Sequence, residues 1–484
     1  MNLLFHKSMI PAPVPALLLA SLFFCRPALC AEPYMPSLDS LYASGLPVLF
    51  VDTDSMALPT ADSVDPPEGC FGATITNRTS VSGRVYMVRC SSDTLYDSGL
   101  YVKSESGMTI RLRGNWSGRR EKASYLVKLE RKADPIAGVE RYRDRNWVLK
   151  FDQNMYPHVI PSLKINGLLR LPWTPRYIWV HLVLNGQYRG LYQLIENVQR
   201  NPEGRIDVSR SGYIIEYDAY WWNEERWFST PLHESVPYMN YTYKYPDSDD
   251  ITEYQSGYIS DYMSQLEASI GDGTYDRYLD VETFARWLLG ADLLGISDGA
   301  GFNIFLTKRD DTPESVLRMS NLWDFDTMMR HEATWSRQHS FFYFPMLFAS
   351  PNRLFTESYI RICEEEGHAV VDSTIRYMRE YACSETGRAL AVSLALDHER
   401  WPIYSVRFDE YADSVVRWLE ERKSWMDMEI TRMKTSLSVS RTVPDGHERK
   451  DAHYYDIFGR RREEEREWRF MKRSLDGRVV IVSN

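Results

Sequence analysis

A group of oxygen-bearing side chains falls within one short part of the sequence. Asp298 and Asn303 stand five residues apart in the segment SDGAGFNIF, and Asp324 and Asp326 flank a phenylalanine in the segment NLWDFDTMM. Carboxylates and carboxamides supply the oxygen ligands that Mg²⁺ prefers, often together with the phosphates of a nucleotide. The same residue types also form turns and helix caps, so the pattern alone leaves a structural role open.

The residues around this group predict a helix, a loop and a β-hairpin. Asp280 is a suitable N-cap for a helix that ends near Gly295, so Asp298 falls in the loop that follows. Residues 302–323 then read as two strands joined by a charged turn. Pairing of these strands is expected to bring Asp298 and Asp324 together at the open end of the hairpin.

This layout matches the division of labour in kinase-type phosphoryl transfer. There, one aspartate orients the acceptor hydroxyl, and an asparagine five residues on holds magnesium together with a later aspartate. By that comparison Asp298 is the catalytic candidate, and Asn303, Asp324 and Asp326 are the candidate metal ligands. An ordinary structural loop explains the same residues equally well.

The size and charge of the chain narrow the classes of protein to consider. With 484 residues, 44% of them hydrophobic, the chain is long enough for one large two-lobed domain or for two to three domains. The formal net charge of -10 argues against nucleic acid as the main partner. Aromatic residues reach 13%, which is common in extracellular proteins that handle polar surfaces or sugars.

The first thirty residues have the pattern of a signal peptide. Lys7 supplies a positive charge, residues 15–24 are apolar, and residues 28–31 offer small side chains for cleavage. We therefore expect residues 1–30 to be removed and the protein to be exported to the periplasm, the cell surface or the extracellular space. No later run approaches eighteen apolar residues, so no transmembrane segment is expected after processing.

Four cysteines remain after the predicted cleavage. An even number of cysteines in an exported chain favours two local disulfides, Cys70–Cys90 and Cys363–Cys383. Four unpaired buried thiols are the alternative. The spacings fit no zinc-binding pattern.

The first half of the chain reads as strand-rich and the second half as mostly helical. Asn185-Gly186 predicts a type I′ turn in a hairpin over residues 177–198. Strands are further expected at 46–54, 72–77, 83–90, 107–115, 124–131, 145–151 and 212–220, and helices from residue 252 to 435. The expected class is α+β, with a β-rich part followed by a helical part.

Several segments in this order resemble the CotH kinase family, secreted and spore-coat proteins with an atypical kinase-like fold. They are IRLRGNWS, EKASYLVKLE, NWVLKFD, VHLVLNGQYRGLYQLIENV, SGYIIEYD and LWDFD. The resemblance implies a two-lobed fold with a β-rich N-terminal lobe over 36–220 and a helical C-terminal lobe over 221–438. It also implies an enzyme that uses ATP with Mg²⁺ or Mn²⁺ to phosphorylate Ser or Thr of a protein substrate.

The resemblance also assigns nucleotide-binding residues. Arg113 and Lys128 are expected to face the nucleotide, because triphosphate requires cations on rigid strands. Glu196 lies where a kinase-like hinge would meet adenine or ribose, although a carboxylate at the rim is an equal alternative. Arg119 and Lys122 are expected to be solvated surface charges.

Two other functional classes compete with a protein kinase. Residues 156–171, expected to form the lobe-bridging helix, contain no glutamate to pair with Lys128, which favours a pseudokinase-like binding module. Trp221, Trp222 and Trp227, with the acids Glu216 and Asp218, suggest a carbohydrate-associated surface protein instead.

Residues 439–484 form a C-terminal tail after the predicted helical lobe. The segment HYYDIFGRR and the final SLDGRVVIVSN predict a small β-hairpin tail. This tail is similar to those that serve sorting or surface attachment in secreted bacterial proteins. A disordered or packing tail is an equal alternative.

Overall fold

A computed structural model describes most of the chain. The described ranges are 34–151, 157–232, 239–296, 302–329, 343–402 and 407–442, together with four short strands between 453 and 482. The predicted signal peptide, residues 1–30, lies outside these ranges. Residues Met35–Asn484 form one compact unit.

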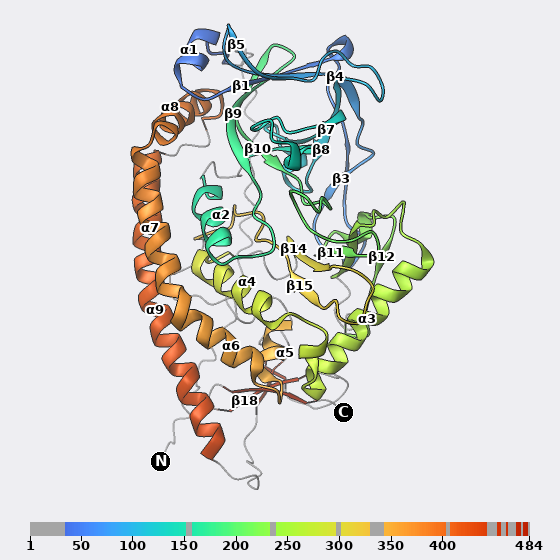
Figure 1. The fold of residues 1–484 in the computed structure, drawn as a ribbon, viewed down its shortest axis with the longest axis vertical. Helices are drawn as coiled ribbons and strands as arrows, with labels where there is room; N and C mark the ends of the chain where they lie inside the picture. Colours follow the sequence, from blue (N-terminus) through green and yellow to red (C-terminus); the bar gives the residue numbers. More distant parts are fainter. Residues whose placement is uncertain are drawn as a thin grey trace, which may run out of the picture. The chain divides into compact units, whose positions relative to one another are not determined.

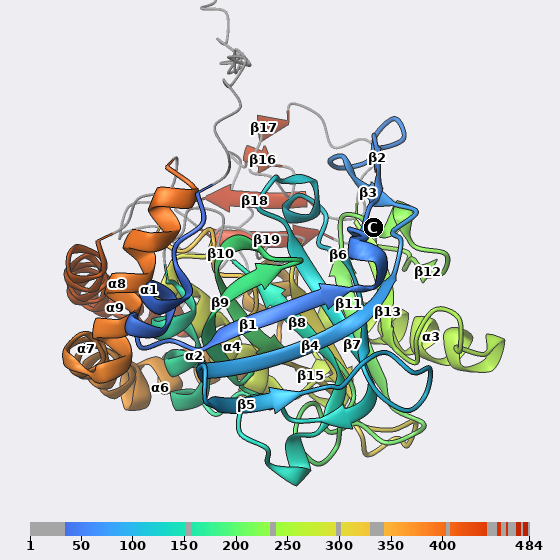
Figure 2. The same ribbon diagram turned by 90° about the horizontal axis from the view of Figure 1, so that it is seen from above.

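Seven strands of the first half close into a β-barrel (Figures 1 and 2). In order around the barrel they are β1 (Val48–Thr53), β9 (Tyr177–Leu184), β10 (Gln187–Glu196), β8 (Asp144–Lys150), β7 (Ser124–Ala133), β6 (Met108–Arg113) and β4 (Val81–Cys90). The barrel closes because β1 pairs with β9 on one side and with β4 on the other. The strand β5 (Asp93–Asp97) pairs with β4 outside this ring, and β2 (Asp62–Val64) pairs with β3 (Thr74–Thr76) in a separate ribbon.

The closed barrel corrects the expected fold class. The two-lobed kinase-like fold with a simple β-rich N-terminal lobe is wrong, because the strands of the first half form a ring instead of an open sheet. The closure depends on the parallel pairing of Val48 with His181, which are far apart in the sequence. Local alternation of apolar residues cannot reveal such a long-range pairing.

The side chains of the barrel strands alternate between its interior and its outer face. Tyr125, Val127 and Leu149 belong to the barrel's interior core. Val148 and Ile195 point outward and join the larger core that the rest of the chain forms. Because strand residues alternate with a period of two, the neighbours of the interior residues also point outward.

A second sheet lies against the helical part and contains the predicted hairpin. Its strand order is β12 (Trp227–Phe228), β13 (Asn240–Tyr245), β11 (Tyr213–Asp218), β14 (Ile304–Lys308) and β15 (Leu317–Met319). Leu306 pairs with Met319 and Lys308 with Leu317, so the strand–turn–strand reading of residues 302–323 is confirmed. Asp310 lies in the turn, as expected.

Most of the described helices lie after residue 252, as the sequence indicates, and two lie in the first half of the chain. The described helices are α1 (Leu38–Ala43), α2 (Val159–Leu168), α3 (Glu253–Asp272), α4 (Val281–Leu294), α5 (Tyr343–Ala349), α6 (Leu354–Ile362), α7 (His368–Cys383), α8 (Glu385–Arg400) and α9 (Phe408–Thr442). Figures 1 and 2 both show α7, α8 and α9 on one side of the barrel and α3 on the other. None of the helices in the described ranges has both the length and the apolar character needed to cross a membrane.

The start of α4 and its end follow from local sequence. The side chain of Asp280 accepts a hydrogen bond from the backbone N–H of Thr283, which caps the helix as predicted. Gly295 ends it with a φ of 63°, a conformation that favours glycine. A side chain at this position would also meet the indole of Trp418 in α9. The end of α4 therefore packs against α9, where the Trp418 indole also donates a hydrogen bond to the carbonyl of Leu293.

The two predicted disulfides are absent. Cys70, Cys90, Cys363 and Cys383 are all free thiols. Cys363 opens a π-helical segment that continues without a break into α7, and Cys383 ends that helix. At 1.5 Å per residue they lie about 30 Å apart along the helix, whereas a disulfide requires Cα atoms within about 7 Å.

The C-terminal tail contains a small antiparallel sheet. Its strands, in spatial order, are β17 (Arg461–Arg462), β16 (His453–Tyr455), β18 (Met471–Leu475) and β19 (Arg478–Val482). The strands β18 and β19 form a hairpin in the final segment of the sequence. A role in sorting or attachment stays a prediction.

Candidate functional site

A row of polar residues crosses the outer face of the barrel. Arg113 in β6 pairs with Ser124 in β7, and Gln193 in β10 pairs with Lys150 in β8. The register between β7 and β8 sets Ser124 opposite Lys150, because Tyr125 pairs with Leu149. All four positions alternate with residues of the interior core, so they point away from the barrel interior. The row therefore faces the part of the molecule that contains the second sheet.

Asp324, in the segment that follows β15, meets this row. Its carboxylate lies 3.1 Å from the ammonium of Lys150, whose side chain is only 9% exposed. The preceding residue, Trp323, is buried, and its ring centroid lies 5.7 Å from the guanidinium carbon of Arg113. The segment after β15 thus covers two of the cations in the row.

The backbone at the two candidate metal ligands is unusual. Asn303 has a φ of 58° and Asp324 a φ of 57°, both in the left-handed region that residues other than glycine rarely adopt. Ser320 donates its backbone N–H to the carbonyl of Phe305 (2.9 Å), which extends the hairpin pairing beyond β15. Continuing this register sets Asn303 opposite Leu322, two residues before Asp324. Strained backbone at polar residues is typical of ligand-binding sites.

Asp326 and Asp298 are the other two members of the predicted group, and the structure describes only Asp326. Asp326 is buried just after Asp324. Asp298, the predicted catalytic residue, lies outside the described residues. No group of three or more His, Cys, Asp or Glu side chains arranged for a metal occurs among the residues that the structure describes. The metal ligands proposed from the sequence therefore remain predictions.

Of the three predicted nucleotide contacts on the barrel, Arg113 lies in the row, whereas Lys128 and Glu196 lie elsewhere. Lys128 points outward on the same face as Ser124, but it is exposed and about 13 Å further along β7. The lysine beside Asp324 is therefore Lys150, which the sequence-based assignment missed. Alternation in the segment NWVLKF, where Trp147 and Leu149 are interior residues, is a signal that could have identified it.

Glu196 is held inside the protein by an arginine. Its carboxylate accepts hydrogen bonds from the backbone N–H and the guanidinium of Arg176, at 2.9 and 3.0 Å. The same guanidinium reaches the carboxylate of Asp134 at 2.8 Å. Burial raises the pKa of Glu196 although these donors oppose the shift. Glu196 thus belongs to a buried ion-pair network with Arg176 and Asp134, and its contact with a nucleotide stays a prediction.

The strand β11 carries a second set of charges, and one of them, Glu216, acts on Arg113. Glu216 forms an ion pair with Lys244 at 2.9 Å. Burial lowers the pKa of the Arg113 guanidinium, and the negative charges of Asp324 and Glu216 oppose that shift. Burial and the neighbouring Glu216 raise the pKa of Asp218 to about 7. The two acids suggested for carbohydrate cleavage thus interact with other charged groups of the protein, Glu216 with Lys244 and Asp218 with Glu216.

The donor set fits a magnesium-bound nucleotide. Arg113 and Lys150 offer cationic donors for phosphate oxygens, and Asp324 offers a carboxylate for the metal. Ser124 adds a hydroxyl whose oxygen is buried and makes no hydrogen bond with any part of the chain that the structure describes. Such a buried hydroxyl next to two cations is a place where a ligand atom can complete the hydrogen bonding.

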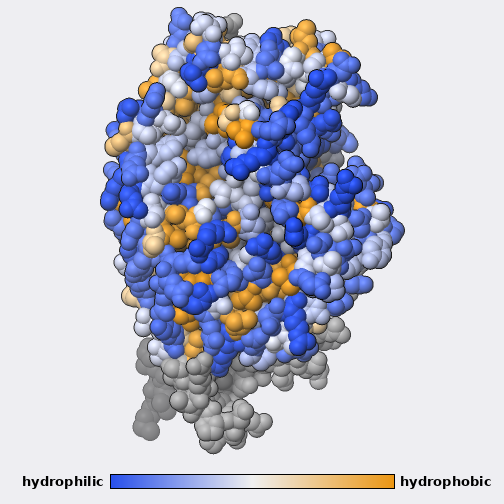
Figure 3. Space-filling view, viewed as in Figure 1, coloured by the Kyte–Doolittle hydropathy of each residue, from blue (hydrophilic) through white to orange (hydrophobic). Residues whose placement is uncertain are grey.

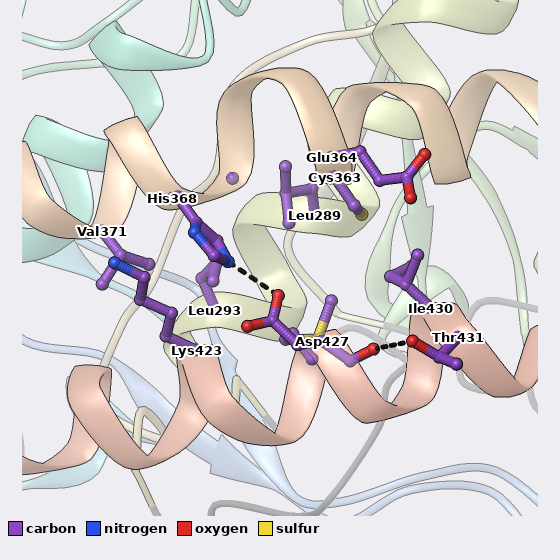
Figure 4. A pocket seen from close by; sticks show the side chains of 12 residues that line it. Leu289, Leu293, Cys363, Glu364, His368, Val371, Lys423, Asp427, Ile430 and Thr431 are labelled. Atoms are coloured by element: carbon purple, nitrogen blue, oxygen red, sulfur yellow. Dashed lines mark hydrogen bonds and ion pairs between the residues drawn. The ribbon is translucent and has the colours of Figure 1, made fainter.

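A hollow among the helices has a different character from the row. It has a volume of about 150 Å³ and lies between α4, the segment Cys363–Gly367 with α7, and α9 (Figure 4). Its charged groups already pair with one another or with neighbours: His368 with Asp427, Lys423 with Asp372, and Lys434 with Glu364. We therefore regard it as a packing feature of the helices. The face of the molecule that Figure 3 draws is largely hydrophilic, with apolar residues in scattered groups.

Comparison with known families assigns most of the chain to one family. A sequence model of the family described as CotH kinase protein matches residues 110–426, which is most of the chain. The matched region begins in β6, just before Arg113, and includes Ser124, Lys150 and Asp324. No curated protein matches the chain.

Proposed function

Because the chain belongs to the CotH kinase family, we propose that it is a protein kinase that transfers the γ-phosphate of ATP to Ser or Thr hydroxyls. The observation that carries the proposal is the meeting of Lys150 and Arg113 with Trp323-Asp324 between the barrel and the second sheet. Cations on rigid strands opposite a carboxylate on a turn are the parts that positioning of a metal-bound triphosphate requires.

Each residue of the site has a distinct task in this proposal. Arg113 and Lys150 bind and orient the phosphates through charge-assisted hydrogen bonds. Asp324 holds Mg²⁺ or Mn²⁺, with Asn303 and Asp326 as further proposed ligands. When bound, ATP supplies the phosphoryl group and the metal offsets the charge on its oxygens. Asp298 orients the acceptor hydroxyl and accepts its proton, as the new O–P bond forms and ADP leaves.

The ion pair between Lys150 and Asp324 must change when the nucleotide binds. In the structure one carboxylate oxygen of Asp324 lies 3.1 Å from the lysine ammonium. On nucleotide binding the lysine would bind phosphate in place of the carboxylate, and the aspartate would hold the metal in place of the ammonium. Both groups keep a partner of opposite charge, so the exchange does not leave a charge without compensation.

Export is part of the same proposal. It rests on the signal-peptide pattern of residues 1–30, with Lys7 before an apolar run and small residues at 28–31. The acceptor would then be a protein of the periplasm, the cell surface or the extracellular space.

A pseudokinase-like binding module is the second candidate. It is favoured by α2, which contains no acidic residue that could take the role of the glutamate that pairs with the lysine of ordinary kinases. In that case the site binds a nucleotide without transferring its phosphate.

Titration of the purified protein with ATP and Mg²⁺, followed by a labelled-phosphate transfer assay, separates these candidates. Saturable, metal-dependent binding together with transfer to protein Ser or Thr supports the kinase. Binding without transfer supports the pseudokinase, and the absence of binding contradicts both.

A further inference from the structure

The hydroxyl of Ser124 is the starting point, because it is buried without a hydrogen-bond partner. The residue is only 1% exposed, and its oxygen has no partner in the ranges for which the structure gives side chains. A buried polar group in this state costs free energy, so such groups are rare in folded proteins. An unsatisfied hydroxyl next to a candidate site therefore calls for an explanation.

The position of Ser124 links it to the two cations of the row. It pairs directly with Arg113 in the neighbouring strand, and the register sets it opposite Lys150 on the other side. Adjacent strands lie about 4.8 Å apart, so the Cα atoms of the three residues span about 10 Å across the sheet. Two cationic donors thus flank one neutral donor on the same face.

In this structure the row is covered by residues of the segment that follows β15. The Trp323 ring lies over Arg113, and the Asp324 carboxylate pairs with Lys150. Both covering residues belong to a segment that contains a left-handed residue, Asp324, and follows a short strand of three residues. A ligand that binds Lys150 in place of Asp324 would therefore approach the Ser124 hydroxyl from the same side.

We propose that the Ser124 hydroxyl donates a hydrogen bond to the phosphate chain of the nucleotide, as the middle donor of the row Arg113–Ser124–Lys150. In the ligand-free protein the Lys150–Asp324 ion pair closes this row. This inference rests on the proposed function, because it assumes that the site accepts a triphosphate. It adds a binding residue that lies in β7, between the two cations.

The test compares Ser124→Ala with the wild-type protein and with Ser350→Ala as a matched control. Ser350 is also buried, but its hydroxyl donates to the carbonyl of Ile270 at 2.7 Å. The probes are ATP with Mg²⁺, inorganic tripolyphosphate with Mg²⁺, and adenosine. Affinity is measured by calorimetry, and thermal unfolding is measured for each ligand-free protein.

We expect Ser124→Ala to weaken ATP and tripolyphosphate binding by about tenfold and to leave the affinity for adenosine unchanged. Its melting temperature without ligand should equal or exceed that of the wild type, because a buried unsatisfied hydroxyl is removed. Ser350→Ala should lower the melting temperature and leave all three affinities unchanged.

Wild-type affinity of Ser124→Ala for both phosphate ligands would overturn the inference. A lower melting temperature with unchanged affinity would identify a buried water as the partner of Ser124, and it would overturn the inference as well. If the wild-type protein itself binds neither ATP nor tripolyphosphate, the proposed function fails, which is a distinct result.

Discussion

The ammonium of Lys150 lies 3.1 Å from a carboxylate oxygen of Asp324, and this contact joins a barrel strand to the turn after the second sheet's hairpin. The lysine side chain is 9% exposed and the aspartate side chain 32% exposed, so the pair is partly shielded from water. Lys150 is proposed to bind phosphate and Asp324 to bind the metal. Their contact therefore marks the place where the phosphate-binding strands of the barrel meet the proposed metal-binding segment.

Replacement of Lys150 by Met is expected to weaken nucleotide binding by about 10- to 100-fold, because one charge-assisted hydrogen bond to phosphate is lost. Lys128→Met is the matched control, since Lys128 lies on the same face of the barrel but is exposed away from Asp324. Calorimetric titration with ATP and Mg²⁺ measures both. If Lys128→Met lost more affinity for ATP than Lys150→Met, Lys128 and not Lys150 would be the nucleotide-binding lysine.

The two acids of the WDFD segment are expected to differ. Asp324→Ala should abolish metal-dependent nucleotide binding, because Asp324 faces the row from the turn. Asp326→Ala should have a smaller or different effect, since Asp326 is more deeply buried. Titration with Mn²⁺ in the presence of ATP measures both variants. Negligible losses in both would refute the metal site.

Local patterns in the sequence predicted several elements of this fold correctly. The turn at Asn185-Gly186 and the hairpin over residues 302–323 are both present, because turn chemistry and alternation depend on neighbouring residues. The closure of the barrel could not be predicted, because the pairing of β1 with β4 and β9 depends on contacts between distant segments.

The candidate site was predicted in part for the same reason. Asp324 and Arg113 stand in recognisable local motifs, and the structure brings Asp324 against the row to which Arg113 belongs. Lys150 and Ser124 gained their significance only from the register of β6, β7 and β8, which no single segment encodes. Lys122 was also misjudged as a surface charge.

Lys122 is instead half of a buried ion pair between the barrel and α8. Its ammonium lies 2.6 Å from the carboxylate of Asp397, and both side chains are 1% exposed. Asp397 also accepts the backbone N–H of Leu191 at 2.6 Å. Lys122→Met should therefore destabilise the protein by about 3–5 kcal/mol, because it leaves a buried carboxylate without its cation.

Chemical denaturation measures this loss, and Arg119→Met is the control. Arg119 is exposed nearby, so its replacement should change the free energy of unfolding by less than about 0.5 kcal/mol. Equal, small effects in both variants would show that the Lys122–Asp397 pair does not fasten α8 to the barrel.

The buried carboxyl of Glu267 in α3 is expected to make stability depend on pH. Burial raises its pKa from 4.5 to about 8, although hydrogen bonds from Thr230 and Tyr343 oppose the shift. The folded protein therefore holds this proton more tightly than the unfolded chain does. The contribution is complete below about pH 4.5 and is lost as the pH rises towards 8, by up to about 1.4 kcal/mol per pH unit.

Glu267→Gln removes the titrating group and keeps hydrogen-bonding atoms in place. The difference in free energy of unfolding between variant and wild type should shift in favour of the variant as the pH rises from 5 to 8. Denaturation curves at several pH values measure this difference. A difference that does not change with pH would show that Glu267 does not titrate in this range.

Transfer of phosphate from ATP at this site is tested most directly by labelled-phosphate transfer with the wild-type protein and with Asp298→Asn. With γ-labelled ATP and Mg²⁺, the wild type should label Ser or Thr of a protein acceptor or of itself. Asp298→Asn should bind ATP with nearly unchanged affinity. Its rate of label transfer should fall by about 10²-fold or more, because the group that accepts the proton is lost. Equal rates of transfer in the two proteins, or no transfer by a wild-type protein that binds ATP, would contradict the account.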